Sequence, residues 1–295
     1  MGSSKNSKMM IGAHVSMAGG LDKAIQRASN IGCNCMQIFS GSPRSWSRNL
    51  PTENDLNKLF SEKKKIDFKS IFTHALYLIN LASPDNELKQ KSINSLIHEL
   101  KFDSLIKGSG VVVHLGSHLG KGWENVKGQL LLTLKEILEK APLDSTLLIE
   151  NSAGQKGKIA SNLDEIHWLI DTLNDQRVGW CVDTCHAFSA GYPLVASSSF
   201  SKDNNTPDLL TEINRLNLIE TLKCIHVNDS QVEFAAGNDR HDNIGEGKIP
   251  PQDLKEFLNH LDIKKIPLIT EVPGFDNKGP DLENIKRIKK LIGEE

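Results

Sequence analysis

One stretch of the chain indicates both its architecture and its site: Val178-Gly179-Trp180-Cys181-Val182-Asp183-Thr184-Cys185-His186. It begins as a short apolar run, which is typical of a buried strand, and ends with Asp183 and His186, two residue types that bind metals. Residues 187–192 are rich in Ala, Ser and Gly, so we expect the strand to run into a loop that forms part of a site. The stretch is informative because similar runs recur along the chain.

Eight short apolar runs alternate with segments that have helical periodicity. The runs cover residues 10–16, 35–40, 70–74, 110–116, 146–151, 178–183, 222–229 and 266–272. The expected helices cover residues 21–30, 55–65, 85–107, 123–140, 161–174 and 207–220, a short segment after Pro251, and residues 281–292. This alternation is typical of parallel βα units, and eight units predict an α/β protein with a closed (β/α)8 barrel, the TIM barrel. No Gly-x-Gly-x-x-Gly follows the first run, which disfavours a dinucleotide-binding open sheet.

Composition and charge set the broad class. The 295-residue chain has a formal charge of −2, and 38% of its residues are hydrophobic. This hydrophobic content supports a sizeable core. No linker or change in composition divides the chain, so we expect one barrel domain over residues 10–295. We expect residues 1–9 to form a flexible tail without a signal peptide, on a monomeric intracellular protein that is cytoplasmic if prokaryotic. No run is long enough to span a membrane, and the five cysteines are expected as buried, reduced thiols.

Seven of the eight runs end near a His, Asp or Glu. These residues are His14, His74, His114, Glu150, Asp183, His226 and Glu271, and three more candidates, His186, Asp239 and His241, lie just beyond the runs. Because functional groups of a barrel gather at the carboxyl ends of its strands, we expect these side chains to converge there. Clustered imidazoles and carboxylates indicate zinc, with manganese or iron as substitutes, and a set this large requires two or three ions.

The predicted metal centre also suggests a reaction. A chain with net negative charge has no general attraction for nucleic acid, so binding a phosphate requires a local source of positive charge. Three divalent ions would overcompensate the four negative charges of Glu150, Asp183, Asp239 and Glu271. A clustered centre of this kind can activate water, hold a phosphate oxygen and stabilise a leaving oxygen. The residues alone therefore indicate hydrolysis of a phosphate ester.

Three segments resemble the endonuclease IV family, the zinc-dependent apurinic/apyrimidinic (AP) endonucleases of base-excision repair, which share the xylose isomerase-like TIM barrel. They are residues 74–82 (HALYLINLA), residues 181–186 (CVDTCH), and residues 226–230 (HVNDS) together with residues 239–241 (DRH). The resemblance extends over nearly the whole chain. It implies three zinc ions per chain: the first bound by His74, His114 and Glu150, the second by Glu150, Asp183, His226 and Glu271, and the third by His186, Asp239 and His241.

The resemblance also implies an activity. The family hydrolyses the phosphodiester 5′ to an abasic site, leaving a 3′-hydroxyl and a 5′-deoxyribose phosphate, and it trims blocked 3′ ends. By resemblance, Glu150 and Glu271 are catalytic, and Arg44 and Tyr77 enter double-stranded DNA at the lesion. This is physically reasonable, because a sugar without its base loses little stacking when it is flipped out and wedge side chains can fill the gap. The sequence departs from the family pattern at Leu115, Trp180 and Gln231, none of which removes a ligand.

Two other functions stay open from the sequence. A metal-dependent sugar isomerase on a similar barrel would need only one or two ions, and the Asp239/His241 pair and the Arg44/Tyr77 pair count against it. A lesion-binding protein without catalytic activity would be expected to have lost some of the ligands, all of which are present.

Several further residues have less specific interpretations. We expect His98, His167 and His260 at the surface of helices, and His118 more often in a structural role than as a phosphate contact. His14 is equally consistent with support of the metal site and with a structural role. Cys181 and Cys185 are expected as small buried side chains rather than as thiolate ligands.

Overall fold

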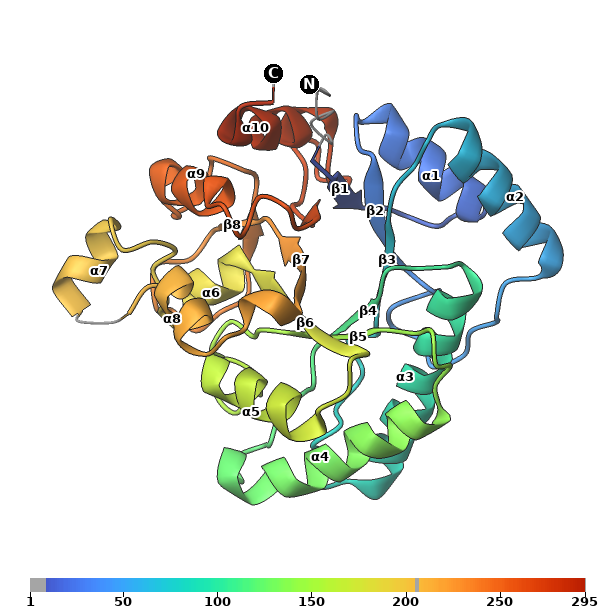
Figure 1. The fold of residues 1–295 in the computed structure, drawn as a ribbon, viewed down its shortest axis with the longest axis horizontal. Helices are drawn as coiled ribbons and strands as arrows, with labels where there is room; N and C mark the ends of the chain where they lie inside the picture. The colour runs from blue at the N-terminus through green and yellow to red at the C-terminus, as the bar shows by residue number, and fades with distance from the viewer. Residues whose placement is uncertain (1–8, 205–206, 295) are drawn as a thin grey trace, which may run out of the picture.

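The computed structural model describes residues 9–204 and 207–294 and contains a closed barrel of parallel strands (Figure 1). The strands are β1 (Ile11–His14), β2 (Cys35–Phe39), β3 (Ile71–His74), β4 (Val111–Val113), β5 (Leu147–Glu150), β6 (Val178–Asp183), β7 (Leu222–His226) and β10 (Leu268–Thr270). They pair in chain order, and β10 closes the ring against β1. The predicted (β/α)8 barrel is confirmed, and each strand lies within its predicted run.

Helices surround the ring of strands (Figure 1). They are α1 (Leu21–Asn30), α2 (Glu53–Lys65), α3 (Asn86–Leu105), α4 (Trp123–Lys140), α5 (Leu163–Leu173), α6 (Thr184–Ala190), α7 (Ser199–Asn204), α8 (Leu209–Arg215), α9 (Pro251–Asn259) and α10 (Leu282–Ile292). Side-chain caps fix where many of them begin, as at Thr52, Asp85 and Asn162, which accept backbone N–H groups of the first turn. Within the described ranges, no helix has the length and apolar character that a membrane crossing requires.

Two expectations about the second half of the chain are wrong. The loop expected after β6 is helix α6, because Asp183 caps it: its Oδ1 accepts the His186 N–H at 2.9 Å. The helix expected over 207–220 is shorter, because Asn217 adopts a left-handed backbone conformation (φ 52°) that ends it, and a 3-10 turn (Ile219–Thr221) follows. The polar segment after β7 also contains a short antiparallel pair, β8 (Asp229–Ser230) and β9 (His241–Asp242).

The amino-terminal tail was expected to include residue 9. Met9 is hydrogen-bonded: its N–H donates to Glu294 Oε1 at 2.9 Å, and its carbonyl accepts the Asn34 side-chain amide at 2.9 Å. These bonds connect the start of β1 to the segment after α10 and to the residue before β2. Residues 1–8, the rest of the expected tail, lie outside the described residues.

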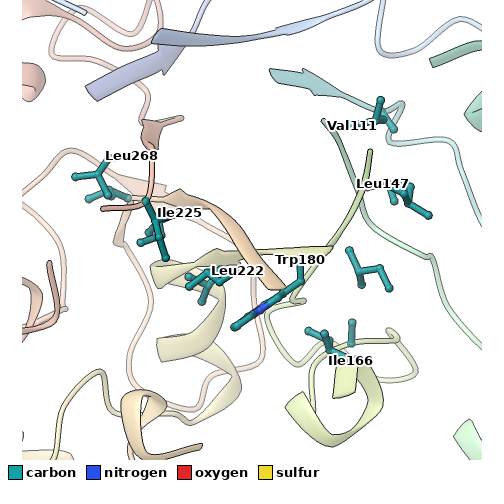
Figure 2. Packing of buried hydrophobic residues seen from close by; sticks show 14 of the residues in the cluster. Val111, Leu147, Ile166, Trp180, Leu222, Ile225 and Leu268 are labelled. Atoms are coloured by element: carbon teal, nitrogen blue, oxygen red, sulfur yellow. The ribbon is translucent and has the colours of Figure 1, made fainter. Parts of the chain in front are cut away.

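Two apolar clusters stabilise the barrel. The outer one fills the space between strands and helices, and Figure 2 shows Trp180 and Leu222 from the strands and Ile166 from α5 among its members. The inner one takes one side chain from each of seven strands: Cys35, Phe72, Val112, Leu148, Cys181, Cys224 and Ile269. The paired position on β1 is Gly12, where a Cβ would lie 2.5 Å from the Cys35 carbonyl oxygen. As predicted, all five cysteines are free and buried.

Trp180 allows a direct test of this packing. It is fully buried, and its Nε1–H donates to the Leu218 carbonyl at 2.8 Å. Trp180→Ala should lower the free energy of unfolding by about 3–5 kcal/mol, because it leaves a cavity. Trp180→Phe should cost less, because it keeps one aromatic ring in the apolar contact and removes the smaller ring with its donor to the carbonyl.

Urea denaturation followed by circular dichroism measures both variants. Leu143→Ala is the control, because the Leu143 side chain is 87% exposed and its truncation should change the free energy by less than about 0.5 kcal/mol. A Trp180→Ala loss as small as the control's would contradict the packing described.

Candidate metal centre

The period of two along the strands places polar side chains above the inner cluster. Two residues after each inner apolar position, the chain has His14, Gln37, His74, His114, Glu150, Asp183, His226 or Glu271, one for each strand. The residues predicted to converge at the strand ends therefore do so. The strand that lacks a His, Asp or Glu, β2, contributes Gln37.

Glu150 lies at the middle of this layer with no exposed surface. Its Oε2 is 3.3 Å from His74 Nε2 and 3.1 Å from His114 Nε2, and its Oε1 is 2.9 Å from His226 Nδ1. The two carboxylate oxygens thus face different imidazoles. A carboxylate in this arrangement can bridge two divalent ions.

The predicted ligand residues gather in three groups, apart from a fourth group of possible ligand atoms formed by Cys181, Cys224 and His226. His74, His114 and Glu150 form one, and Glu150, Asp183, His226 and Glu271 form a second, each with ligand atoms within 4.8 Å of one another. Glu271 Oε2 lies 3.2 Å from His226 Nδ1. These two groups have the same members as the first two zinc sites implied by the family resemblance.

The third group contains His186 and His241 and has two nearby carboxylates. Asp239 Oδ1 is 3.2 Å from His186 Nε2 and 3.3 Å from His241 Nε2. Asp183 Oδ2 is 3.4 Å from His241 Nε2, and Asp183, His186 and His241 also form a group within 4.8 Å. Asp183 therefore faces both the second and the third group.

Hydrogen bonds orient three of the imidazoles. His74 Nδ1 lies 2.7 Å from the Ala75 carbonyl, and His186 Nδ1 lies 3.0 Å from the Asn151 carbonyl. Because a carbonyl oxygen can only accept, each Nδ1 carries the proton and each Nε2 is left free toward the cluster. Imidazoles that each have one fixed N–H and turn the other nitrogen toward carboxylates fit zinc.

Gln37 orients the His226 imidazole in the same way, through a hydrogen bond to one ring nitrogen. Its Oε1 accepts the His226 Nε2–H at 2.9 Å, and its Nε2 donates to Glu271 Oε1 at 2.7 Å. His14 Nδ1 is 3.1 Å from the same Glu271 oxygen, so His14 contacts a candidate ligand. Sequence reasoning missed Gln37, although its spacing of two residues from Cys35 repeats the pattern of the other strands.

The charges of the cluster stabilise one another. Burial by itself raises the pKa of Glu150, but His114 and His226 outweigh it and hold that pKa well below its usual range. Burial by itself lowers the pKa of His186, but Asp183, Asp239 and Glu150 hold it well above its usual range. For His114 burial dominates and lowers the pKa to about 4, which favours the neutral form that binds metals.

Tyr77 and Arg44, the two predicted DNA-contacting residues, are both exposed but have different surroundings. Tyr77 is 61% exposed, and its ring packs edge-on against Phe39 with the centroids 5.3 Å apart. It lines a recess together with His114, His186, Asp239 and the exposed Lys158. Arg44 is exposed on the loop after β2, and no hydrogen bond joins its side chain to another described residue.

Four residues with less specific interpretations can now be assigned a role or a place from their contacts: His98, His118, Cys181 and Cys185. His118 Nδ1 accepts the Gly120 and Gly122 N–H groups at 3.2 and 3.1 Å, which is a structural role in its loop. His98, expected at the surface of a helix, is half-buried on α3, and both of its ring nitrogens are buried without a hydrogen-bond partner in the described part of the chain. Cys181 forms part of the inner apolar cluster, and Cys185 is buried with its Sγ 3.5 Å from the Arg240 carbonyl.

Comparisons with known proteins give consistent results. Residues 25–291 match the family described as xylose isomerase-like TIM barrel. The chain is 38% identical over 283 residues to a probable endonuclease 4 of Halothermothrix orenii (96% of this chain, 100% of that one). It is 39% identical over 286 residues to a probable endonuclease 4 of Thermosipho africanus (95% and 99%). Among solved structures, endonuclease IV from Thermus thermophilus matches with a TM-score of 0.83 at 28% identity (97% and 100%).

A second solved structure concerns the fold only. A D-tagatose 3-epimerase-like protein matches with a TM-score of 0.69 at 18% identity, covering 97% of this chain and 97% of that one. At this identity the match indicates a shared barrel and carries no information on activity.

Removal of metal should destabilise the protein. Without ions, the buried carboxylates and imidazoles lose their common partner, so treatment with a strong chelator should lower the thermal midpoint by roughly 6–12 °C. Differential scanning calorimetry before and after zinc is restored measures the shift, and metal analysis should find about three ions per chain. An unchanged midpoint with one ion or none would contradict a trinuclear centre.

Gln37→Leu should weaken metal binding without removing a ligand. It deletes the bonds that orient His226 and Glu271, so zinc affinity should fall by roughly 10- to 100-fold. A competition titration against a chromophoric chelator measures this. Gln129→Leu, at an exposed position of α4, should leave the affinity unchanged, and equal affinities for the two variants would count against the role of Gln37.

Proposed function

This chain belongs to the xylose isomerase-like TIM barrel family and to its endonuclease 4 members, and we propose that it is a zinc-dependent AP endonuclease. It would hydrolyse the phosphodiester 5′ to an abasic site in double-stranded DNA, leaving a 3′-hydroxyl and a 5′-deoxyribose phosphate. Removal of blocked 3′ ends, which leaves the same 3′-hydroxyl, is part of the proposal.

The observation that carries the proposal is the position of Glu150 between two groups of imidazoles, with a third group alongside. His74, His114 and Glu150 would bind the first ion, and Glu150, Asp183, His226 and Glu271 the second. His186, Asp239 and His241 would bind the third. When bound, the ions supply Lewis acidity toward a phosphate and lower the pKa of water.

The chain's own residues prepare the site for this chemistry. Glu150 and Glu271, the two proposed catalytic carboxylates, are held in place: His226 contacts both, and Gln37 donates to Glu271 Oε1. Asn228 Nδ2 donates to Asp183 Oδ2 at 2.7 Å. Such fixed side chains need no rearrangement when a phosphate arrives, which is the main way in which an electrostatic site accelerates a reaction.

Residues at the rim account for the proposed choice of substrate. Tyr77 is exposed beside the proposed ligands, and the exposed Lys158 lines the same recess with an ammonium group suited to a phosphate. We propose that Tyr77 and Arg44 fill the space left by the missing base, which keeps the neighbouring bases stacked while the abasic sugar turns toward the ions. Gln231, where the family has a lysine, is exposed and would contribute less to phosphate binding.

The alternatives fit the site less well. A sugar isomerase needs one or two ions, and the third group around His186 and His241 then has no use. A lesion-binding protein without activity would have no reason to keep nine ligand residues in three groups. The epimerase-like structures share the barrel but only at identities too low to indicate activity.

The direct test is cleavage of a duplex that contains one abasic site. The purified protein with zinc should cut one strand 5′ to that site, leave the matching intact duplex uncut, and stop after strong chelation. Gel electrophoresis resolves the products, and phosphatase treatment identifies their ends. Isomerisation of a sugar together with an uncut abasic duplex would refute the proposal.

Glu150→Gln should nearly abolish that cleavage. It keeps the shape of the side chain but removes the charge that two ions would share. The loss in kcat/KM should therefore exceed the roughly 10- to 100-fold typical of changes outside the ligand set. Glu139→Gln, at an exposed position of α4, is the matched control and should cleave normally. Wild-type rates for Glu150→Gln would exclude it as a bridging ligand.

A further inference from the structure

One side chain makes the polar contacts of the loop that carries Arg44 with the rest of the barrel. Among the described residues, Arg48 makes all the hydrogen bonds between residues 41–50 and the rest of the chain. Its guanidinium donates to Glu99, to Ser95 Oγ at 2.6 Å and to Ser40 Oγ at 3.4 Å. The Arg48 side chain is only 2% exposed and that of Glu99 not at all, whereas Arg44 four residues earlier is exposed.

The backbone of the loop passes close to the Arg48 side chain. A Cβ added at Gly41 would lie 2.9 Å from Arg48 Cγ, so the chain turns back over the arginine at a residue without a side chain. Trp46, between Arg44 and Arg48, packs partly buried against the outer apolar cluster. The loop is therefore folded around Arg48 rather than merely crossing it.

The partners of Arg48 belong to a buried polar stripe on α3. Ser92, Ser95 and Glu99 are spaced three and four residues apart, so they lie along one face of the helix, and all three are buried. Ser92 Oγ accepts the Asn80 N–H at 3.0 Å, and Asn80 belongs to the loop that carries Tyr77. One stripe on α3, which packs outside β3 and β4 (Figure 1), thus holds both loops.

Stability alone does not explain the buried charge pair. Replacement of such pairs by apolar residues of similar volume is often neutral or stabilising, because two desolvated charges regain little more than their desolvation costs. Here Arg48 Nε and Glu99 Oε2 have no hydrogen-bond partner in the described part of the chain, which makes the pair still less favourable. Its geometric effect, by contrast, is specific, because it fixes where the loop sits.

We propose that Arg48 and Glu99 are positioning residues: through the α3 stripe they hold Arg44 at a fixed distance from Tyr77, so that both side chains reach the same lesion. This inference rests on the proposed function. Arg48 does not touch the DNA or the ions itself. It removes the need to order the loop upon binding, and ordering of a flexible loop is a cost that weakens association.

The test replaces both charges at once. Arg48→Met alone would leave the Glu99 charge buried and unpaired, which destabilises strongly, so the double variant R48M/E99L is used. It should keep the thermal midpoint near that of the wild type. Its KM for the abasic duplex should rise by about 10-fold or more with a smaller change in kcat, because binding rather than chemistry depends on the ordered loop.

A double-mutant cycle with Arg44→Ala shows whether Arg48 acts through Arg44. Arg44→Ala should raise KM in the wild-type background and have little further effect in R48M/E99L. The matched control is R215M/E212L, which removes another Arg–Glu pair with the same change in charge from α8. A wild-type KM for R48M/E99L, or an undiminished effect of Arg44→Ala in it, would overturn the proposal.

A second measurement needs no DNA. Trypsin should cut after Arg44 several-fold faster in R48M/E99L than in the wild type or the α8 control, because the loop opens more often when it is not held. Mass spectrometry identifies the fragments that end at Arg44. Equal rates would overturn the positioning role even if the wild type cleaves abasic DNA. If R48M/E99L is cut faster but the wild type cleaves no abasic DNA, the role of Arg48 and Glu99 in holding the loop would be supported and the proposed function refuted.

Discussion

The structure depends on the alternation of side chains along its barrel strands. Each strand turns one apolar residue into the barrel and, two residues later, one polar residue at the carboxyl-end face, as Leu148 precedes Glu150 and Cys224 precedes His226. A shift of one residue in any strand would exchange these with the positions that face the helices. The same register therefore fills the core and builds the site, and neither can change without the other.

This constraint explains how an acidic protein can concentrate carboxylates in its interior. Glu150 has no exposed surface and Asp183 none, and burial of such charges is unfavourable unless they have partners. The partners inside the protein are imidazoles whose remaining nitrogens are tied to carbonyl oxygens, such as that of Asn151. Divalent ions bound by these side chains would complete the compensation, which would couple metal binding, stability and the proposed reaction in one layer.

A second layer of polar contacts lies outside the barrel. Ser92, Ser95 and Glu99 of α3 are buried, and they hold the loops that carry Arg44 and Tyr77. The barrel thus supports two surface loops through one helix face. In the proposed endonuclease, the ions would act on the phosphate while this outer layer determines which DNA can reach them.

The sequence by itself determined the barrel and most of the side chains that gather at the carboxyl ends of its strands. Periodicity revealed eight strands, and the His, Asp or Glu at the ends of seven of them marked the site, because both follow from local spacing. Tertiary structure decided what depends on contacts between distant segments. Only the closed barrel brings Gln37 against His226, and only folding of the loop over α3 buries Arg48 against Glu99. No local pattern reports such partners, since the energy of a buried polar group depends on what the rest of the chain places beside it.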